Sequence, residues 1–287
     1  MRLHPMYSAG LIFEGGGMRG AYTTGVIDAF LDNDLEFSRC YGVSVGACNA
    51  ASFLAKQRRR AYRVTTDYIG DKRYCSLRNL LTTGNLFGPE MLYHTIPEKL
   101  DPYDYDTFSR YAGILSVVVT NCETGEAEYF HLKNMREEVN VLQASSSLPL
   151  LAKPVLINGA EYLDGGVADS IPLQRSIDDG NVKNVIVLTQ DITYRKKPMK
   201  IVPLLKIFYR KYPHLVDQLA TRHLRYNQTL DLLAQEESAC RAFVLRPQKP
   251  VNIGRVETNK TKLAALYDDG YRDTIARMDD LKAFLEK

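Results

Sequence analysis

Apolar and polar positions along the first part of the chain predict strands joined by helices. A short apolar run, Ala9–Phe13, is followed by glycines and then by an amphipathic stretch from Met18 to about Leu31. A second short run, Cys40–Val43, leads into small residues that continue to Leu54. Short apolar runs suit buried strands, and longer stretches with a repeat near 3.6 residues suit helices. This order predicts an α/β fold with parallel strands connected by crossover helices.

Further along the chain, the pattern predicts more strands and two hairpins. Ile114–Thr120 is rich in valine and predicts a buried strand, and Glu126–Leu132 predicts the strand that returns after a turn. A second hairpin is predicted over Pro154–Leu163, with the strong turn signal Asn-Gly at its centre. Val185–Thr189 predicts another strand. Arg58–Arg110 is polar and rich in tyrosine, which favours short helices and loops, and some of these tyrosines are candidates to line an acyl pocket.

The character of the sequence changes after Asp191. No acidic residue occurs over 192–216, and basic residues alternate with apolar ones over 195–211. This pattern predicts an amphipathic helix, which either covers the core with a solvated basic face or contacts an anionic membrane peripherally. A late strand is expected over 242–246, and Thr261–Leu285 has helical spacing.

These observations predict two units. The core is expected over residues 8–191, and a mainly helical C-terminal extension over 192–287, which returns one strand to the core.

Composition excludes some classes of partner. The 287 residues carry a formal net charge of only +3, so bulk charge does not indicate a nucleic-acid binder. Five widely spaced cysteines with no C-x-x-C pair suit reduced thiols in the cytoplasm. No apolar run approaches the ~20 residues that span a bilayer, and Met1–Leu11 does not resemble a secretory signal. We therefore expect a cytoplasmic protein, either soluble or peripheral to a membrane.

A glycine cluster, Gly15-Gly16-Gly17-Met18-Arg19-Gly20, lies between the first predicted strand and helix. Such a turn presents backbone N–H groups that suit a phosphate or a developing oxyanion, although it also occurs as a plain turn. It also matches the dinucleotide pattern G-x-G-x-x-G, which needs an acidic residue at the end of the second strand. That position holds Gly42-Val43-Ser44-Val45-Gly46 instead, which favours acyl chemistry over nucleotide binding.

Ser44 lies in a G-x-S-x-G motif between a strand and a helix, a sharp turn that exposes a nucleophilic serine. Gly42 and Gly46 allow the close approach of the backbone. A serine needs a base, and none of the five histidines lies in a motif that would bring it to Ser44. Asp164-Gly165-Gly166 directly follows a predicted strand, so Asp164 is a candidate base.

Together, the glycine cluster, the serine motif and Asp164-Gly165-Gly166 resemble the patatin-like phospholipase family, over about Ser8–Gln190. The resemblance implies a three-layer α/β/α fold with a mostly parallel sheet and a Ser–Asp dyad. Ser44 would be the nucleophile and Asp164 the base. Gly15, Gly16 and Gly17 would form the oxyanion hole, supported by Arg19. Glu14 stands where many members carry aspartate.

The same resemblance implies hydrolysis of carboxylic esters of lipids, with no metal or organic cofactor. Two alternatives stay open. One is a carboxylesterase or thioesterase for short acyl chains, and the other is a catalytically silent lipid-binding protein with the same fold.

Overall fold

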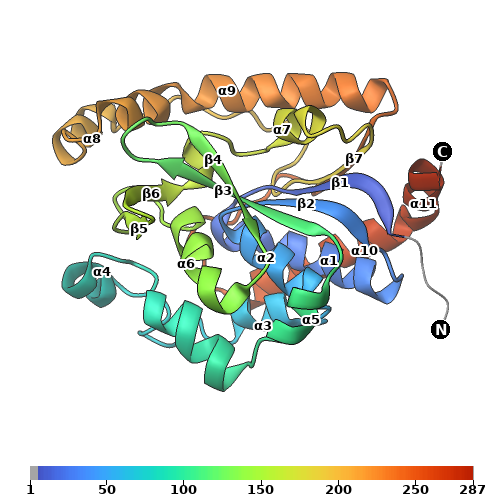
Figure 1. Cartoon of the computed structure of the whole chain (residues 1–287), viewed down its shortest axis with the longest axis horizontal. Coiled ribbons are helices and arrows are strands. Elements are labelled where there is room, and N and C mark those ends of the chain that lie inside the picture. The colour runs from blue at the N-terminus through green and yellow to red at the C-terminus, as the bar shows by residue number, and fades with distance from the viewer. Residues whose placement is uncertain (1–5, 287) are drawn as a thin grey trace.

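The computed structural model describes residues 6–286, which form a single mixed sheet with helices on both faces (Figure 1). The strands run in the order β5-β6-β3-β2-β1-β7-β8, and β4 pairs with β3 beside this path. Their bounds are β1 Tyr7–Phe13, β2 Phe37–Val43, β3 Ile114–Asn121, β4 Ala127–Leu132, β5 Val155–Ile157, β6 Ala160–Asp164, β7 Asn184–Val187 and β8 Ala242–Leu245. The pairs β3–β2, β2–β1, β1–β7 and β7–β8 are parallel, whereas the pairs β3–β4, β3–β6 and β5–β6 are antiparallel. The predicted mostly parallel sheet and both hairpins are confirmed.

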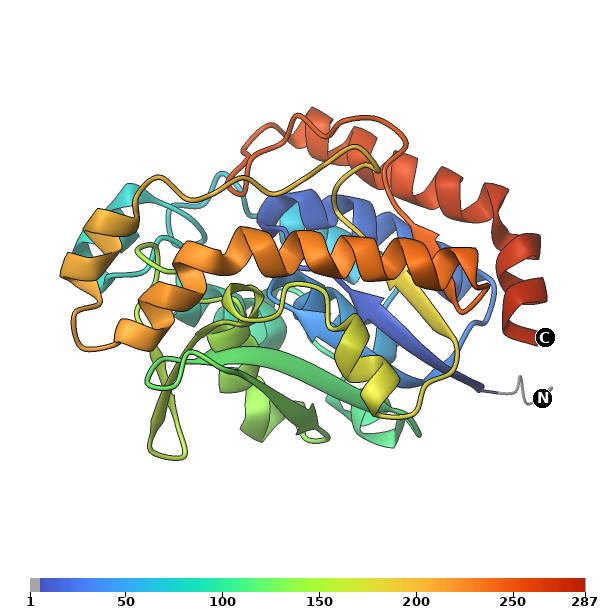
Figure 2. The same cartoon turned by 90° about the horizontal axis from the view of Figure 1, so that it is seen from above.

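Helices form the two outer layers (Figures 1 and 2). One face is covered by α1 (Ala21–Asp32), α2 (Val45–Leu54), α6 (Met135–Ser145) and α10 (Lys260–Ala276). The other face is covered by α7 (Leu173–Asp178) and the long α9 (Pro213–Ser238). The remaining helical segments are η1 Gly17–Gly20, α3 Arg60–Thr66, α4 Leu77–Thr83, η2 Met91–Leu100, α5 Tyr105–Arg110, η3 Gly165–Val167, α8 Val202–Phe208 and α11 Met278–Glu286. The three-layer α/β/α architecture that the sequence predicted is therefore confirmed.

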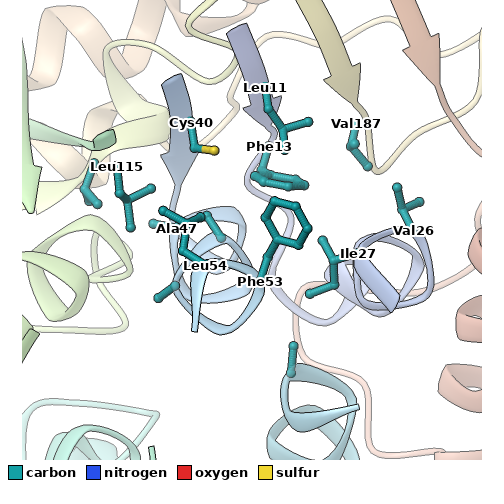
Figure 3. Close-up of a cluster of buried hydrophobic side chains, with 14 of the residues drawn as sticks. Leu11, Phe13, Val26, Ile27, Cys40, Ala47, Phe53, Leu54, Leu115 and Val187 are labelled. Atoms are coloured by element: carbon teal, nitrogen blue, oxygen red, sulfur yellow. The ribbon is translucent and has the colours of Figure 1, made fainter. Parts of the chain in front are cut away.

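Burial on both faces explains why the first strand is an uninterrupted apolar run. Successive side chains of a strand point to opposite faces. Leu11 and Phe13 of β1 pack toward α1 and α2, whereas Ile12 belongs to the core on the α9 side. Figure 3 shows the first of these clusters, in which sheet residues meet Val26, Ile27, Ala47, Phe53 and Leu54 from the two helices. A parallel sheet covered on both faces requires this continuous hydrophobic pattern.

The C-terminal part of the chain is built into the same core. β8 extends the sheet by pairing in parallel with β7, and α10 packs along α1. The two helices approach so closely that a Cβ on Gly25 would lie 2.1 Å from the Tyr267 carbonyl oxygen. A Cβ on Gly270 would lie 2.1 Å from the Tyr22 carbonyl oxygen. The division into units at residue 191 stays a prediction.

The helix predicted over 195–211 is shorter than expected. Residues 192–201 are irregular, and the helix α8 covers only Val202–Phe208. Pro198 disfavours the helical conformation of the residue before it, and Pro203 suits only a first helical turn. Across residues 6–286, no helix combines the length and apolar character needed to cross a bilayer. The expectation about a secretory signal rests partly on residues 1–5, which lie outside the described residues.

Candidate active site

Ser44 occupies a strained turn between β2 and α2. Its backbone has φ 56° and ψ −129°, a left-handed conformation that costs a non-glycine residue about 1–3 kcal/mol. The flanking glycines permit the turn, because a Cβ on Gly42 would lie 2.5 Å from Ala47 Cα. A Cβ on Gly46 would lie 2.5 Å from the Phe13 carbonyl oxygen. The predicted strand–turn–helix context of Ser44 is therefore observed, with the serine near the N-terminus of α2.

A second serine holds this turn in place. The Ser44 N–H donates to Ser145 Oγ at 2.8 Å, and the Ser145 hydroxyl donates to the Val118 carbonyl oxygen at 2.6 Å. Ser145 is fully buried at the end of α6. The run Ser145-Ser146-Ser147 lies in no G-x-S-x-G motif, so the sequence alone predicts a helix-end or turn role for it and gives no signal for this link between the turn and β3.

Asp164 reaches Ser44 because two strands end head to head. β2 and β6 pair with the same edge of β3 from opposite directions, while β4 occupies the other edge. The last residue of β2, Val43, is opposite Val118, and Asp164 is opposite Val119. Val43 and Asp164 therefore occupy consecutive positions along one edge of β3, so Ser44 comes beside Asp164, and both line the same small cavity.

The Asp164 carboxyl is buried and only partly hydrogen-bonded. Its Oδ1 accepts from the Gly166 N–H at 2.8 Å, whereas its buried Oδ2 has no hydrogen-bond partner within residues 6–286. Burial raises the pKa of Asp164, and Arg222, the Ser44 hydroxyl and the Gly166 N–H oppose this shift. Gly165 is required for space, since a Cβ there would lie 2.1 Å from the Val118 carbonyl oxygen.

The glycine cluster adjoins the serine. A Cβ on Gly15 would lie 3.0 Å from Ser44 Cβ. Gly17 has φ +58°, and a Cβ there would lie 2.5 Å from the Arg255 carbonyl oxygen, which also accepts from the Met18 N–H at 3.1 Å. Gly15, Gly16 and Gly17 all line the cavity that contains Ser44 and Asp164. The sequence gave no sign that residue 255 would support this loop.

The Glu14 side chain anchors the start of the glycine loop through three hydrogen bonds. Its Oε2 accepts from the Thr189 N–H at 2.6 Å and from the Thr189 hydroxyl at 2.9 Å, and its Oε1 accepts from the Tyr226 hydroxyl at 2.6 Å. Glu14 is buried. This glutamate, where the family resemblance leads one to expect aspartate, therefore anchors the end of β1 to β7 and α9.

Arg19 lines the same cavity, and three further cations join it: Lys196, Arg222 and Arg255. Burial lowers the pKa of Arg19 and lowers that of Lys196 to about 7 and that of Arg222 to about 10. Mutual repulsion adds to the shifts, since Arg222 and Arg255 both lower the pKa of Lys196. Sequence reasoning anticipated only Arg19 among these cations.

An apolar cavity of about 170 Å³ also begins at Ser44. Its walls come from α2, α3, η2 and α6, and they include tyrosines from the polar middle section: Tyr74, Tyr93, Tyr103 and Tyr105. Arg60 also lines this cavity and is buried, with its guanidinium donating to the Asp101 carbonyl oxygen. From the sequence alone, the basic run Lys56, Arg58, Arg59 and Arg60 predicts a solvated helix end, and this prediction is wrong for Arg60.

None of the described histidines lines either cavity at Ser44. His131 instead contacts the Ser116 hydroxyl through Nδ1 at 2.9 Å. His4 lies outside the described residues. Asp164 is thus the carboxylate in the cavity of Ser44 that keeps an oxygen without a partner within residues 6–286, because both Glu14 oxygens are already engaged.

Comparison with known proteins agrees with this architecture. A family model described as patatin-like phospholipase matches residues 11–176, and one described as a domain of unknown function matches residues 212–286. The solved structure of VipD from Legionella pneumophila is similar, with a TM-score of 0.54 at 15% identity; the match covers 96% of this chain and 67% of that chain.

Three relatives are similar in sequence. The uncharacterized protein YjjU of Escherichia coli is 29% identical, over 62% of this chain and 51% of its own length. The probable lipid hydrolase 463L of Invertebrate iridescent virus 6 is 25% identical, over 63% of this chain and 68% of its own length. The lysophospholipase NTE1 of Candida albicans is 22% identical, over 96% of this chain and 20% of its own length. This chain therefore spans about half of the Escherichia coli relative and a fifth of the Candida one. The family match extends over more than half of the chain and contains the strained serine and the aspartate that meets it, so the chain belongs to the patatin-like phospholipase family.

Proposed function

We propose that the protein is a serine hydrolase that cleaves carboxylic ester bonds of lipids, with Ser44 as nucleophile and Asp164 as base. One observation carries the proposal. A serine in a strained turn shares a cavity with a buried carboxylate whose Oδ2 has no partner within residues 6–286. The names of two relatives, a probable lipid hydrolase and a lysophospholipase, support the same reaction class.

In the proposed mechanism, Asp164 takes the Ser44 proton as Oγ attacks the ester carbonyl carbon. The N–H groups of Gly15, Gly16 and Gly17 stabilise the oxyanion, and each such donor contributes about 3 kcal/mol. Arg19 adds positive charge beside them. The tetrahedral intermediate then collapses, the leaving alcohol takes the proton from Asp164, and an acyl-serine remains. Water, deprotonated by Asp164, releases the fatty acid.

The apolar cavity supports a long acyl chain rather than a short one. It begins at Ser44 and continues between α2, α3 and η2, with walls that are mainly aliphatic and aromatic. Burying methylene groups in such a cavity contributes about 0.8 kcal/mol for each CH₂. We therefore expect kcat/KM to rise with chain length in a series of p-nitrophenyl esters. A maximum at acetate or butyrate would favour the short-chain esterase alternative.

The test of the chemistry is covalent labelling with a fluorophosphonate, followed by turnover of mixed lipids. Wild type should be labelled, and Ser44→Ala should lose both labelling and fatty-acid release. Ser238→Ala is the matched control, because Ser238 lies at the far end of α9 and its hydroxyl donates only to the Ala234 carbonyl oxygen. Labelling or turnover that persists in Ser44→Ala would refute the assignment. A folded wild type that is neither labelled nor active would favour the silent lipid-binding alternative.

We further propose peripheral contact with an anionic membrane, extending the expectation for 195–211. α8 exposes Leu204, Ile207 and Phe208, and Ile207 and Phe208 are 71% and 66% exposed. α4, at the same end of the molecule (Figures 1 and 2), exposes Leu77 and Leu81. Basic residues flank these apolar tips: Arg78, Lys153, Lys197, Lys200, Lys206, Arg210 and Lys211. Apolar tips surrounded by cations suit a peripheral attachment at a cytoplasmic membrane surface.

Vesicle sedimentation tests this contact. Wild type should bind vesicles that contain phosphatidylglycerol more strongly than vesicles of phosphatidylcholine alone. The double variant Ile207→Ser, Phe208→Ser should lose most of this binding, whereas Val182→Ser, which changes an equally exposed side chain away from α8, should not. Equal binding by wild type to both vesicle types would contradict the proposal.

A further inference from the structure

Two cavities meet at Ser44, and their walls differ in chemistry. The apolar cavity and the polar cavity share Gly17, Ser44 and Leu148. The polar cavity continues into a wider depression, because four residues line both: Tyr194, Lys196, Arg222 and Arg255. An ester held at Ser44 therefore has an apolar space for its acyl chain and a polar space for the remainder of the molecule.

The polar side carries an excess of positive charge. Four cations line the polar cavity: Arg19, Lys196, Arg222 and Arg255. Its two carboxylates are Glu14, which is occupied by Thr189 and Tyr226, and Asp164. The outer depression adds Lys197 and Arg195, of which Arg195 is paired with Asp231, and no acidic residue among 6–286 lines the depression. This charge distribution suits an anion and disfavours a cation.

Among the residues that the structure describes, two of these cations carry a buried donor nitrogen without a partner. The buried Nε atoms of Arg19 and Arg222 have no hydrogen-bond partner within residues 6–286. None of the four cations belongs to an ion pair of 4.0 Å or less in the described part of the chain. A buried guanidinium nitrogen without an acceptor is costly, and a bound anion would supply acceptors for the two Nε atoms.

The geometry points to a ligand with several acceptor oxygens. A guanidinium presents donors in a planar fork that matches phosphate, and an ammonium contributes a point charge. Two contacts fix the position of Lys196. Its backbone N–H donates to Asn227 Oδ1 at 2.9 Å, and its ammonium lies 4.0 Å from the centroid of the Tyr226 ring. Arg222 is held by the Ser170 hydroxyl, 3.1 Å from its terminal nitrogen.

We propose that Lys196, Arg222 and Arg255 form a phosphate subsite that makes the enzyme prefer acyl lipids with a net-anionic headgroup over zwitterionic choline lipids. The inference rests on the proposed function, because the subsite is defined relative to an ester at Ser44. A phosphomonoester fits the cluster directly. The quaternary ammonium of a choline headgroup would extend toward Lys197 and Arg195. The Asp231 carboxylate already pairs with Arg195 at 3.1 Å, and no acidic residue of the described chain lines the depression itself.

All three residues lie outside the part of the chain that matches the patatin-like model. Lys196 lies between the two matched regions, and Arg222 and Arg255 lie within 212–286, which matches a domain of unknown function. The segment 192–201 runs beside α9 in Figure 2, consistent with the contacts between Lys196 and Asn227. The C-terminal region thereby gains a specific role, the selection of the headgroup.

The test compares three lipids with the same oleoyl chain in neutral detergent micelles: lysophosphatidic acid, lysophosphatidylcholine and monooleoylglycerol. The full-length wild type should have the highest kcat/KM for the phosphomonoester. In Lys196→Gln and Arg255→Gln, the ratio of kcat/KM for lysophosphatidic acid to that for monooleoylglycerol should fall by roughly tenfold or more, the usual effect of losing one charge-assisted hydrogen bond. Lys72→Gln, at an exposed position, is the control and should keep the wild-type ratio.

We expect Arg255→Gln to fold normally, so that a change in its substrate ratio reports on the phosphate subsite. Its backbone carbonyl, which supports Met18, is unchanged by the substitution, and its exposed side chain has no role in the core. Wild type that uses all three lipids equally, or variants that keep the wild-type ratio, would overturn the proposal.

A second arm uses inorganic phosphate and separates this inference from the proposed function. Phosphate should raise the Tm of wild type and inhibit hydrolysis competitively, and both effects should weaken in Arg222→Gln. Stabilisation by phosphate without turnover of any ester would refute the proposed function while supporting the anion site. Stabilisation together with turnover that shows no headgroup preference would identify a site for free phosphate and overturn the headgroup inference.

Discussion

Removing the Ser145 hydroxyl should loosen the serine turn without touching the reacting atoms. In Ser145→Ala, the Ser44 N–H loses its acceptor and the Val118 carbonyl oxygen loses a donor, 2.8 and 2.6 Å away in wild type. Both groups are buried, and each unsatisfied group costs about 1–3 kcal/mol. Because Val118 keeps its partners in the sheet, we expect the free energy of unfolding to fall by about 2–3 kcal/mol.

The kinetic effect follows from the strain at Ser44. The backbone conformation with φ 56° is held by its surroundings, and the Ser145 hydrogen bond is one of the contacts that hold it. Without it, the serine populates relaxed conformations in which Oγ no longer faces Asp164. We expect the second-order rate of fluorophosphonate labelling to fall by about tenfold to a hundredfold, corresponding to 1.4–2.7 kcal/mol.

Ser147→Ala is the matched control for this prediction. Ser147 is two residues away and buried, but its hydroxyl donates only to the Gln143 carbonyl oxygen within the same helical turn. Urea denaturation followed by circular dichroism gives the free energy of unfolding, and stopped labelling reactions give the rate. If Ser145→Ala and Ser147→Ala show equal stability and equal labelling rates, the hydrogen bond does not hold the turn and the reasoning is wrong.

Three further predictions follow from burial and close packing. Asp164→Asn should abolish lipid hydrolysis yet raise the free energy of unfolding at neutral pH. The substitution removes a buried charge and keeps an acceptor for the Gly166 N–H. Activity assays and urea denaturation of the same variant check both effects. As the proposed base, Asp164 would act only when ionised, and its pKa is raised. We therefore expect kcat/KM to fall on acidification at a pH above the ordinary aspartate pKa of about 4. A pH–rate profile whose acid limb lies at or below pH ~4 would contradict the assignment. Gly270→Ala should destabilise the protein by about 2–4 kcal/mol in urea denaturation, because its Cβ would lie 2.1 Å from the Tyr22 carbonyl oxygen, whereas Gly70→Ala, with open space at its Cβ, should be neutral or nearly so.

The sequence predicted the layers of the fold well because local signals and burial agree. Ala9–Phe13 and Ile114–Thr120 are apolar runs that only a doubly covered sheet can bury, and both are strands in the structure. The Asn158-Gly159 turn has positive φ at both residues, 51° and 85°, as the Asn-Gly signal requires. Where local signals conflict, prediction was weaker. The prolines at 198 and 203 limited the helix expected over 195–211.

The sequence also indicated which residues form the proposed dyad, but not what surrounds them. The glycines at 42, 46 and 165 signal close backbone approach, and the structure shows each such approach. Ser145 and Arg222 carry no comparable signal, since their hydrogen-bond partners Ser44 and Ser170 lie 101 and 52 residues away in the sequence. Contacts between segments that are distant in sequence depend on strand register, which a single sequence does not reveal.

The position of Asp164 supports the proposal that a carboxylate acts here without histidine. The head-to-head ends of β2 and β6 bring the carboxyl to the serine directly, so no intermediate ring is needed to span the gap. Burial makes the carboxylate more basic, while Arg222 and Arg255 limit that effect and favour ionisation at neutral pH. These two arginines come from the C-terminal part of the chain. The same cations that would hold a phosphate therefore also set the proton affinity of the proposed base, and neutralising them by a bound headgroup would raise the pKa of Asp164 when substrate is present.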